Sequence, residues 1–343
     1  ILGLVFTDSI MELMGAQADT LQVGRSYFRI IMIGFVFQSL NMSISAALRG
    51  IGETRVPMII NLRCNFLNVI GNAILIYGLL GFPRLGITGA GISTALSNAV
   101  ASVFIFGYVL KGKSVVRFSI KKPFNLNRRI LYNLFKIGMP ASFEQLVLRT
   151  GVLLFVRIVA ELGTVIYAAH QIALSILGLS FQPGQAFGIA ASSLVGISLG
   201  AGKPDMAEEY ARKTRKFGSI ISTFMAIIFF FFGPQIVGLY SGDPMIIKNS
   251  SVALKLIALV QPFQSSQFIL AGALRGAGDT FWPLVSTSVG VLMVRVVLAY
   301  IFVSIMGYGL TGAWIALLVD QFVRWMFVYF RFKTGVWKYI KIK

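Results

Sequence analysis

The sequence has few of the residues that build catalytic or metal sites, since its 343 residues include one cysteine and one histidine. Cys64 has no second cysteine with which to form a disulfide, and Cys64 and His170 alone cannot make a Cys/His zinc site. No Ser-His pattern is visible, and no Gly-x-x-x-x-Gly-Lys-[Ser/Thr] loop is present to bind nucleotide phosphates. We therefore expect neither an enzyme nor a resident metal or cofactor.

Acidic residues are scarce as well, because 12 aspartates and glutamates stand against 31 lysines and arginines, for a net charge of +19. Such a charge suits nucleic-acid binding, but here the basic residues lie between apolar runs and not along one face. Hydrophobic residues make up 56% of the chain, charged residues make up 13%, and the mean hydropathy is +0.80. This composition predicts an all-α polytopic membrane protein, positive on its cytoplasmic side, with no nucleic-acid partner.

The apolar runs have the length of about 20 residues that a helix needs to cross a bilayer. The segment 111–136 is basic and contains no acid, so we expect it in the cytoplasm, together with the loop 203–216 and the C-terminal tail. We expect the end of a partial span over residues 1–14 and then nine complete spans, at 27–48, 56–79, 87–110, 132–161, 166–199, 217–240, 251–274, 283–306 and 310–332.

An internal repeat divides these spans into two halves. The stretch Ala47-Leu-Arg-Gly-Ile-Gly-Glu-Thr-Arg-Val-Pro57 returns as Ala273-Leu-Arg-Gly-Ala-Gly-Asp-Thr-Phe-Trp-Pro283, a shift of 226 residues. Further on, Gly86-Ile-Thr-Gly-Ala meets Gly309-Leu-Thr-Gly-Ala at a shift of 223 residues. Repeats of whole helical segments are how many transporters form a site between two halves, so we expect a two-lobe helical bundle.

Each copy of the repeated stretch is expected to form a hairpin between two spans. Gly50 and Gly276 can adopt the left-handed conformation that ends a helix. Thr54 and Thr280 can cap the helix that follows.

The repeat also predicts the division of the chain into segments. We expect an N-lobe over 1–110, a basic linker over 111–131, a C-lobe of six helices over 132–332 and a basic tail over 333–343. Residues 128–226 have no counterpart in the first half, and the chain opens on Ile1 within an apolar run. We therefore expect an N-terminal truncation that has removed the first two helices of the N-lobe.

Several motifs resemble those of one transporter family. They are the paired Leu-Arg-Gly-x-Gly-[Glu/Asp]-Thr hairpins, Asn65-Phe-Leu-Asn68 before Leu75-Ile-Tyr-Gly78, the Gly86-Ile-Thr-Gly-Ala turn, Gly138-Met-Pro-Ala and Ala168-Ala-His-Gln-Ile-Ala. In these motifs the chain resembles the multidrug and toxic compound extrusion (MATE) family, from the third of its twelve helices onward. The resemblance implies two six-helix lobes around a central cavity, and the export of amphipathic, often cationic compounds in exchange for Na⁺ or H⁺.

The resemblance also implies candidate cation-coupling residues. Many members of the family use an acid on the first helix, an Asn and an Asp on the fifth, and a Thr on the sixth. In this sequence Asn68 and Thr94 match that pattern, while Asn72 stands at the Asp position. Other members use a Glu on the seventh helix, where this chain has Glu144, one turn earlier. Asp279 in the second hairpin is a further candidate.

Charged side chains inside apolar spans need a partner or a function, because an acid at the centre of a span costs about 2.5 to 3.5 kcal/mol on insertion scales. Glu144 is therefore either a coupling residue or an acid hydrogen-bonded to a neighbour. Two pairs at i, i+4 spacing are expected to be structural ion pairs, Arg157 with Glu161 and Asp320 with Arg324, and Asp320 can also reach Arg295 on the preceding span.

Polar side chains in the remaining spans are candidates to line the cavity or to contact a neighbouring helix, because they are costly against lipid. For His170 we favour a packing role over proton transfer. The candidate cavity-lining residues are Gln38, Gln264, His170, Gln171, Gln182 and Gln185.

These features predict a cation-coupled multidrug antiporter that works by alternating access. A flippase for lipid-linked saccharides, with the same two-lobe plan, is the alternative, and a strongly cationic cavity would favour it. A membrane-embedded enzyme would need clustered acids or histidines, which the sequence does not show. We expect a monomer in the plasma membrane, with small amphipathic or cationic substrates and membrane lipid as partners.

Overall fold

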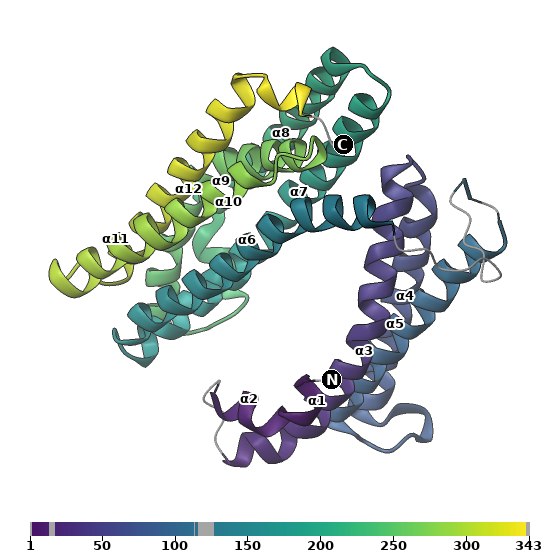
Figure 1. The fold of residues 1–343 in the computed structure, drawn as a ribbon. Helices are drawn as coiled ribbons and strands as arrows, with labels where there is room; N and C mark the ends of the chain where they lie inside the picture. Colours follow the sequence, from purple (N-terminus) through teal and green to yellow (C-terminus); the bar gives the residue numbers. More distant parts are fainter. Residues whose placement is uncertain (1, 14–17, 113, 116–126, 341–343) are drawn as a thin grey trace. The chain divides into compact units, whose positions relative to one another are not determined.

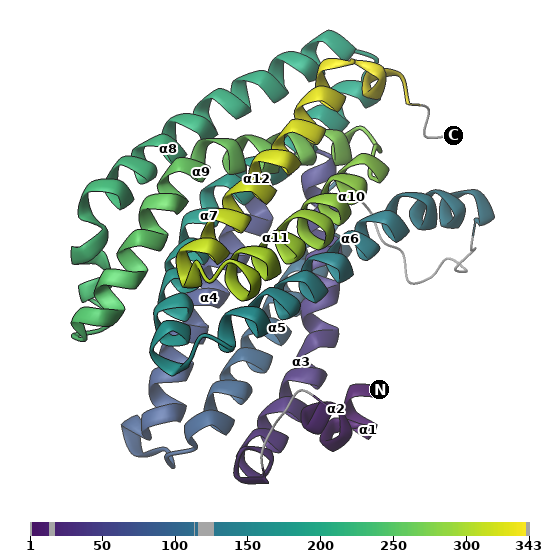
Figure 2. The same cartoon turned by 90° about the vertical axis from the view of Figure 1, so that its left-hand side faces the viewer.

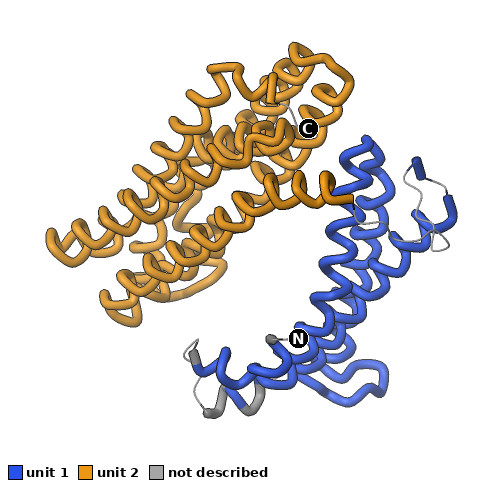
Figure 3. The backbone as a smooth tube through the Cα atoms, in the orientation of Figure 1, with its two compact units in different colours: residues 1–124 blue, residues 125–343 orange. Residues whose placement is uncertain are grey.

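The computed structural model describes residues 2–13, 18–112, 114–115 and 127–340, and within these residues it contains helices and no strand. The chain forms two compact units, residues 1–124 and 125–343 (Figure 3). The boundary between them falls inside the predicted basic linker, of which residues 113 and 116–126 lie outside the described part.

Unit 1 is built on three long helices (Figure 1), in which α5 packs against both α3 and α4. Its elements are α1 (Leu2–Val5), α2 (Thr7–Leu13), α3 (Ala18–Gly50), α4 (Arg55–Tyr77), η1 (Leu79–Gly81) and α5 (Gly86–Leu110). The partial span expected over 1–14 appears as two short helices with a bend at Phe6. The Thr7 hydroxyl donates to the carbonyls of Gly3 and Leu4, at 2.8 and 3.1 Å, and such side-chain bonding to the preceding turn bends helices.

Unit 2 contains the remaining long helices, and α7, α8 and α9 lie side by side in it (Figure 2). Its elements are α6 (Arg128–Ala160), α7 (Thr164–Gly200), α8 (Pro204–Gly238), α9 (Pro244–Gly276), α10 (Phe281–Thr287), η2 (Ser288–Val296), α11 (Val297–Tyr300), η3 (Ile301–Ile305), α12 (Gly309–Lys333) and η4 (Val336–Tyr339). The segment from α10 to η3 is one continuous helix that alternates between α and π geometry, and it packs between α6 and α12.

Small residues allow α7 and α9 to approach each other at backbone distance. A Cβ on Gly272 would overlap the carbonyl oxygen of Gly188, and a Cβ on Gly276 would overlap that of Ser192. Inside a bilayer no hydrophobic effect drives helices together, because lipid tails are as apolar as the side chains. Close packing of this kind is therefore a main source of stability there. The contact fixes α9, which carries Arg275 in its last turn, against the rest of unit 2.

Most of the predicted spans are helices of the required length. Eight described helices are long and apolar enough to cross a membrane, including the α10 to η3 segment. The span expected at 132–161 is also helical, as α6, but Lys136, Glu144, Arg149 and Arg157 make it more charged than the others. The chain is thus a multi-pass helical protein, and one of its predicted spans carries charged residues along its length.

The two repeated hairpins have the same backbone, but their turns differ from the expectation. The left-handed residues are Gly52 (φ 88°) and Gly278 (φ 82°), and the helices continue through Gly50 and Gly276. The reason is the hydrogen bond that closes each turn. The N–H of Glu53 donates to the carbonyl of Leu48, and the N–H of Asp279 donates to the carbonyl of Leu274, so the left-handed residue is the glycine just before the acid. Thr54 and Thr280 have helical dihedral angles, and neither side chain caps the next helix.

The predicted tail folds back on unit 2. Trp337 is fully buried, and its indole N–H donates to the carbonyl of Phe332 at 2.9 Å. Lys338 forms ion pairs with Asp205, at 3.4 Å, and with Glu208 at the start of α8. The hydrogen bond from Lys338 to Glu208 raises the pKa of the Lys338 ammonium. The C-terminal segment is therefore tied to the first turns of α8.

Candidate functional site

Glu144 lies at the centre of a polar contact between three helical elements of unit 2. It is 1% exposed on α6, four residues after Pro140, which lacks an N–H to continue the helical bonding. Glu144 Oε1 accepts a hydrogen bond from Arg275 Nη2 of α9 at 2.6 Å, and another from Thr287 Oγ1 of α10 at 3.1 Å. The carboxylate is thus hydrogen-bonded to neighbouring helices, as a buried charge requires.

A second ion pair lies deeper in unit 2. Asp320 of α12 is 0% exposed, and its Oδ2 accepts from Arg295 Nε at 2.9 Å and also from Arg295 Nη2. Of the two partners that the sequence allowed, the structure selects Arg295. In the described residues no ion pair joins Asp320 to Arg324, although Arg324 is 3% exposed, and neither Asp320 Oδ1 nor Arg324 Nε has a hydrogen-bond partner.

The other predicted ion pair is wrong. Arg157 and Glu161 are both exposed, and among the described residues no ion pair joins them. The helix ends at Ala160, and Glu161 is its C-cap residue. Two exposed side chains also gain little from pairing, because water screens the attraction while both lose conformational freedom.

Asp279 is engaged in the second hairpin. Its carboxylate accepts from Arg331 Nε of α12 at 2.8 Å, and the same guanidinium lies over the ring of Trp282, at 5.3 Å from its centroid. Its counterpart Glu53 in unit 1 accepts from the backbone N–H of residue 115 at 3.3 Å. Both hairpin acids therefore tie the turn to a neighbouring segment, and a coupling role for Asp279 stays a prediction.

The three polar residues predicted in unit 1 come together. Asn68 Nδ2 donates to Thr94 Oγ1 at 3.2 Å, and Asn72 Nδ2 donates to Asn68 Oδ1 at 3.2 Å. Ser93 joins them, because its hydroxyl donates to the Asn68 carbonyl at 3.0 Å. Asn72 Oδ1 is buried and has no hydrogen-bond partner. The cluster offers neutral oxygens and no carboxylate.

The candidate cavity-lining residues differ in how far they are buried. His170 is 0% exposed and packs between the rings of Phe155 and Trp314, with both centroids 5.5 Å away, which fits the packing role. Gln264 is 1% exposed, with neither amide atom hydrogen-bonded. Gln171 is partly buried and donates to the hydroxyl of Tyr167 at 2.6 Å. The remaining three, Gln38, Gln182 and Gln185, are exposed. Whether any of them lines a cavity stays a prediction.

The partners of Glu144, Arg275 and Thr287, were not predicted from the sequence. The repeat contained a hint, because Thr287 lies 226 residues after Asn61, and Asn61 Oδ1 accepts from Asn41 Nδ2 at 2.8 Å in unit 1. The position is therefore polar and hydrogen-bonded in both units.

In the part of the chain that the structure describes, no group of three or more His, Cys, Asp or Glu residues could hold a metal ion.

A family model described as MatE matches residues 1–74 and 140–301 of this chain. The chain is 31% identical to the "Probable multidrug resistance protein NorM" of Thermotoga maritima, over 92% of this chain and 67% of that protein. It is 27% identical to the "Multidrug export protein MepA" of Staphylococcus aureus, over 93% of this chain and 68% of that protein.

Among solved structures, the chain is similar to an "Outward-facing conformation of a multidrug resistance MATE family transporter of the MOP superfamily", with a TM-score of 0.88 and 25% identity. That match covers 98% of this chain and 75% of the solved one. The described helices thus have the fold of a solved transporter, and the same region matches in sequence.

Proposed function

This chain belongs to the multidrug and toxic compound extrusion family, and we propose that it exports small amphipathic or cationic compounds in exchange for Na⁺ or H⁺. The family consists of transporters, and eight helices in the described part of this chain are long and apolar enough to cross a membrane. The similarity to NorM and MepA supports multidrug export as the activity. Coupling to a cation gradient and alternating access are the steps that an experiment has to test.

The observation that carries the coupling proposal is the buried carboxylate of Glu144. Among the described residues its charged partner is Arg275, whose side chain is 32% exposed, while that of Glu144 is 2% exposed. The arginine can therefore withdraw toward solvent more easily than the acid. A proton on Glu144, or a Na⁺ ion beside it, would replace the positive charge of Arg275 and loosen the contact between α6 and the end of α9.

Unit 1 supports the same assignment by what its polar cluster can supply. Asn68, Asn72 and Thr94 provide amide and hydroxyl oxygens, which suit a desolvated Na⁺ ion but cannot take up a proton at ordinary pH. The negative charge that favours a coupling cation, or accepts a coupling proton, must therefore come from an acid such as Glu144. We assign the principal coupling role to Glu144 and a secondary, neutral one to the cluster of unit 1.

The remaining features of the proposal follow from the family and from the charge distribution. We place the protein in the plasma membrane, with the linker 111–131 and the C-terminus in the cytoplasm, because the basic residues gather there. We further propose that it acts as a monomer, with membrane lipid around it and without a nucleic-acid partner or a cofactor besides the coupling ion.

The test is export of a fluorescent cation from proteoliposomes, under a Na⁺ gradient and under a pH gradient in separate experiments. Glu144→Gln should reduce gradient-driven export at least about tenfold, since it removes the charge while keeping the shape. Glu161→Gln is the matched control, because Glu161 is an exposed acid at the end of the same helix and should leave export unchanged. Export by Glu144→Gln at the rate of the parent would overturn the assignment.

The same proteoliposomes test the alternative function. Translocation of a lipid-linked saccharide in the absence of gradient-driven cation export would favour the flippase. The observation that supports this alternative is an excess of positive charge. Three arginines, Arg275, Arg295 and Arg324, lie around the two acids Glu144 and Asp320, and a cationic site would favour a phosphate-bearing lipid-linked saccharide.

A further inference from the structure

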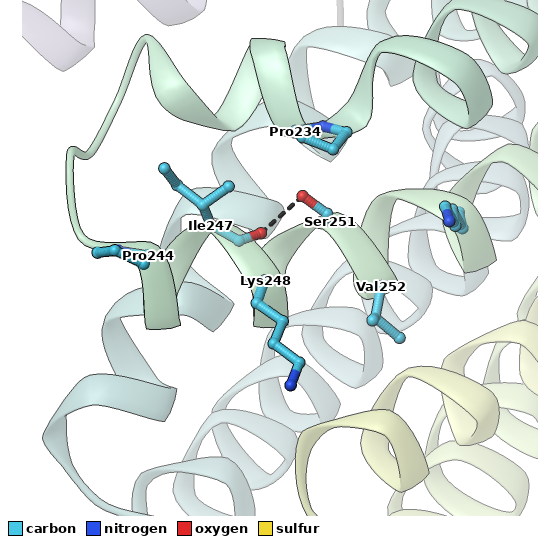
Figure 4. Close-up of a pocket in the computed structure, with 7 residues that line it drawn as sticks. Pro234, Pro244, Ile247, Lys248, Ser251 and Val252 are labelled. Atoms are coloured by element: carbon cyan, nitrogen blue, oxygen red, sulfur yellow. Dashed lines mark hydrogen bonds between the residues drawn. The ribbon is translucent and has the colours of Figure 1, made fainter.

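A groove runs along α9 where α8 ends, away from the polar contacts of Glu144. It has a volume of about 460 Å³ and is lined by Pro234 of α8 and by Pro244, Ile247, Lys248, Ser251, Val252 and Lys255 of α9 (Figure 4). In Figure 4 the Ser251 hydroxyl points back to its own helix, where it donates to the carbonyl of Ile247 at 2.6 Å. The groove wall is therefore apolar apart from its two lysines.

The groove is a fixed feature of the backbone. Phe232 has non-helical dihedral angles (φ −108°, ψ 17°) two residues before Pro234, so α8 is kinked just before its end. A proline inside a helix removes one backbone hydrogen bond and clashes with the preceding turn, which prevents the helix from straightening. Next to this kink the groove opens on α9, where Val252 is 40% exposed.

The two lysines form a positively charged stripe. Lys248 and Lys255 are seven residues apart, so they lie on one face of α9, about 10 Å apart along its axis. Both side chains are exposed, and among the described residues neither forms an ion pair. In contrast, Lys338 and Lys213 at the other end of α8 have acidic partners.

The position of the stripe points to the headgroup region of the bilayer. Helix α9 begins at Pro244, so Lys248 and Lys255 lie about 6 and 16 Å along its axis from its first residue. Between and beyond them, α9 exposes Val252 and Leu259, at 40% and 55%, which are side chains that face lipid. Lysines at this depth extend toward the interface and gain from an anionic group there, because an unpaired cation beside hydrocarbon is costly.

We propose that this groove binds an anionic phospholipid, with the phosphate between Lys248 and Lys255 and an acyl chain along Pro234, Ile247 and Val252. Charge complementarity selects the headgroup, since two unpaired cations and no acid line the groove. The apolar wall selects a lipid over a soluble anion, since phosphate or a nucleotide would gain nothing from two prolines, an isoleucine and a valine. The proposal does not depend on the transport assignment, because it concerns lipid retained at the surface of unit 2.

The test is native mass spectrometry of the purified protein exchanged into mixed phosphatidylglycerol and phosphatidylcholine. The parent should retain phosphatidylglycerol in preference to phosphatidylcholine. Lys248→Gln with Lys255→Gln should lower the retained phosphatidylglycerol at least about fivefold and leave phosphatidylcholine unchanged. The matched control is Lys203→Gln with Lys216→Gln, which removes two exposed lysines from the other end of α8 and should change retention less than twofold.

Several outcomes would overturn the proposal. Equal loss of phosphatidylglycerol in both double variants would show a general charge effect rather than a site. Competition by inorganic phosphate at millimolar concentration would show a soluble-anion site, and capture of a protein in place of lipid would show a docking surface. If the double variant does not fold, each single variant should still lower retention at least about twofold, and unchanged retention in both would contradict the site. Loss of export with lipid retention intact would count against the transport proposal alone.

Discussion

The ion pair between Asp320 and Arg295 provides the sharpest test of how unit 2 is held together. We consider Asp320→Asn, which keeps the shape of the side chain and removes its charge. Oδ2 of Asp320 accepts two hydrogen bonds from Arg295, and the amide oxygen of an asparagine can take over that place. The amide nitrogen must then replace Oδ1, which has no hydrogen-bond partner and lies close to Gly290. The variant therefore adds a buried donor without an acceptor and leaves Arg295 without a counter-charge.

The magnitude follows from the burial of the pair. The side chains of Asp320 and Arg295 are 0% and 7% exposed, so solvent does not screen the loss. Removing one partner of a buried ion pair costs about 3 to 5 kcal/mol, because the other charge stays buried. For a folding unit of roughly 200 residues, about 2 °C of Tm is lost per kcal/mol, so we expect Tm to fall by at least about 6 °C.

The assay is thermal unfolding of the purified protein in detergent, with the parent and Glu161→Gln measured beside it. Glu161 is an exposed acid without an ion pair in the described residues, so its variant should melt within about 1 °C of the parent. The double variant Asp320→Leu with Arg295→Met removes both charges and should recover at least about 2 kcal/mol of the loss. An Asp320→Asn protein that melts within 2 °C of the parent would show that the pair is not a structural element.

Three further predictions concern other contacts of the fold. Glu144→Gln should lower Tm by less than about 4 °C while lowering export, because Arg275 is partly exposed and can be solvated. A fall in Tm of more than about 4 °C with export unchanged would indicate a structural role. Gly272→Ala should destabilise the protein by more than about 2 kcal/mol through its overlap with α7, whereas Gly50→Ala meets nothing within 4 Å and should be neutral in a denaturation curve. Trp337→Ala should cost about 3 kcal/mol and expose the C-terminal segment to protease, and unchanged proteolysis would contradict its anchoring role.

The helices and their order could be predicted from the sequence. Apolar runs of bilayer length predict where each spanning helix lies, and the repeat predicts which helices of the two halves correspond. The turn was harder to predict. Arg49-Gly-Ile-Gly52 contains two glycines, and either can end a helix, yet the left-handed residue is the second. The choice depends on which carbonyl the N–H of Glu53 reaches, and the sequence pattern alone does not specify that hydrogen bond.

For Asp320 the sequence allowed two partners, Arg324 at i, i+4 spacing and Arg295 on the preceding span, and the pair that forms is the one between spans. Arg295 and Asp320 are 25 residues apart on consecutive antiparallel spans, so their pairing follows from burial and topology. Arg157 and Glu161 satisfy the i, i+4 spacing, but both are exposed at a helix end, where an ion pair contributes little to stability. The partner of Glu144 is 131 residues away on a helix that is not its neighbour in sequence, and no periodic pattern connects the two.

Two polar contacts of this chain occur in one half of the repeat and have no counterpart in the other. At the shifts that align the two halves, Arg295 and Asp320 of unit 2 correspond to Val69 and Ser97 of unit 1, where neither charge is present.

The reverse holds for the amide cluster, because Asn68 and Thr94 of unit 1 correspond to Val294 and Leu317 of unit 2. A buried charge or amide is tolerated only with its partner, so a half that lost one member of a pair would carry the full cost of the other. The hairpin turns, which depend on backbone geometry, occur in both halves, whereas the Arg295–Asp320 pair and the Asn68–Thr94 pair each occur in one half and are missing from the other. These two pairs therefore behave as units, and a function assigned to one member of such a pair should be tested by changing both.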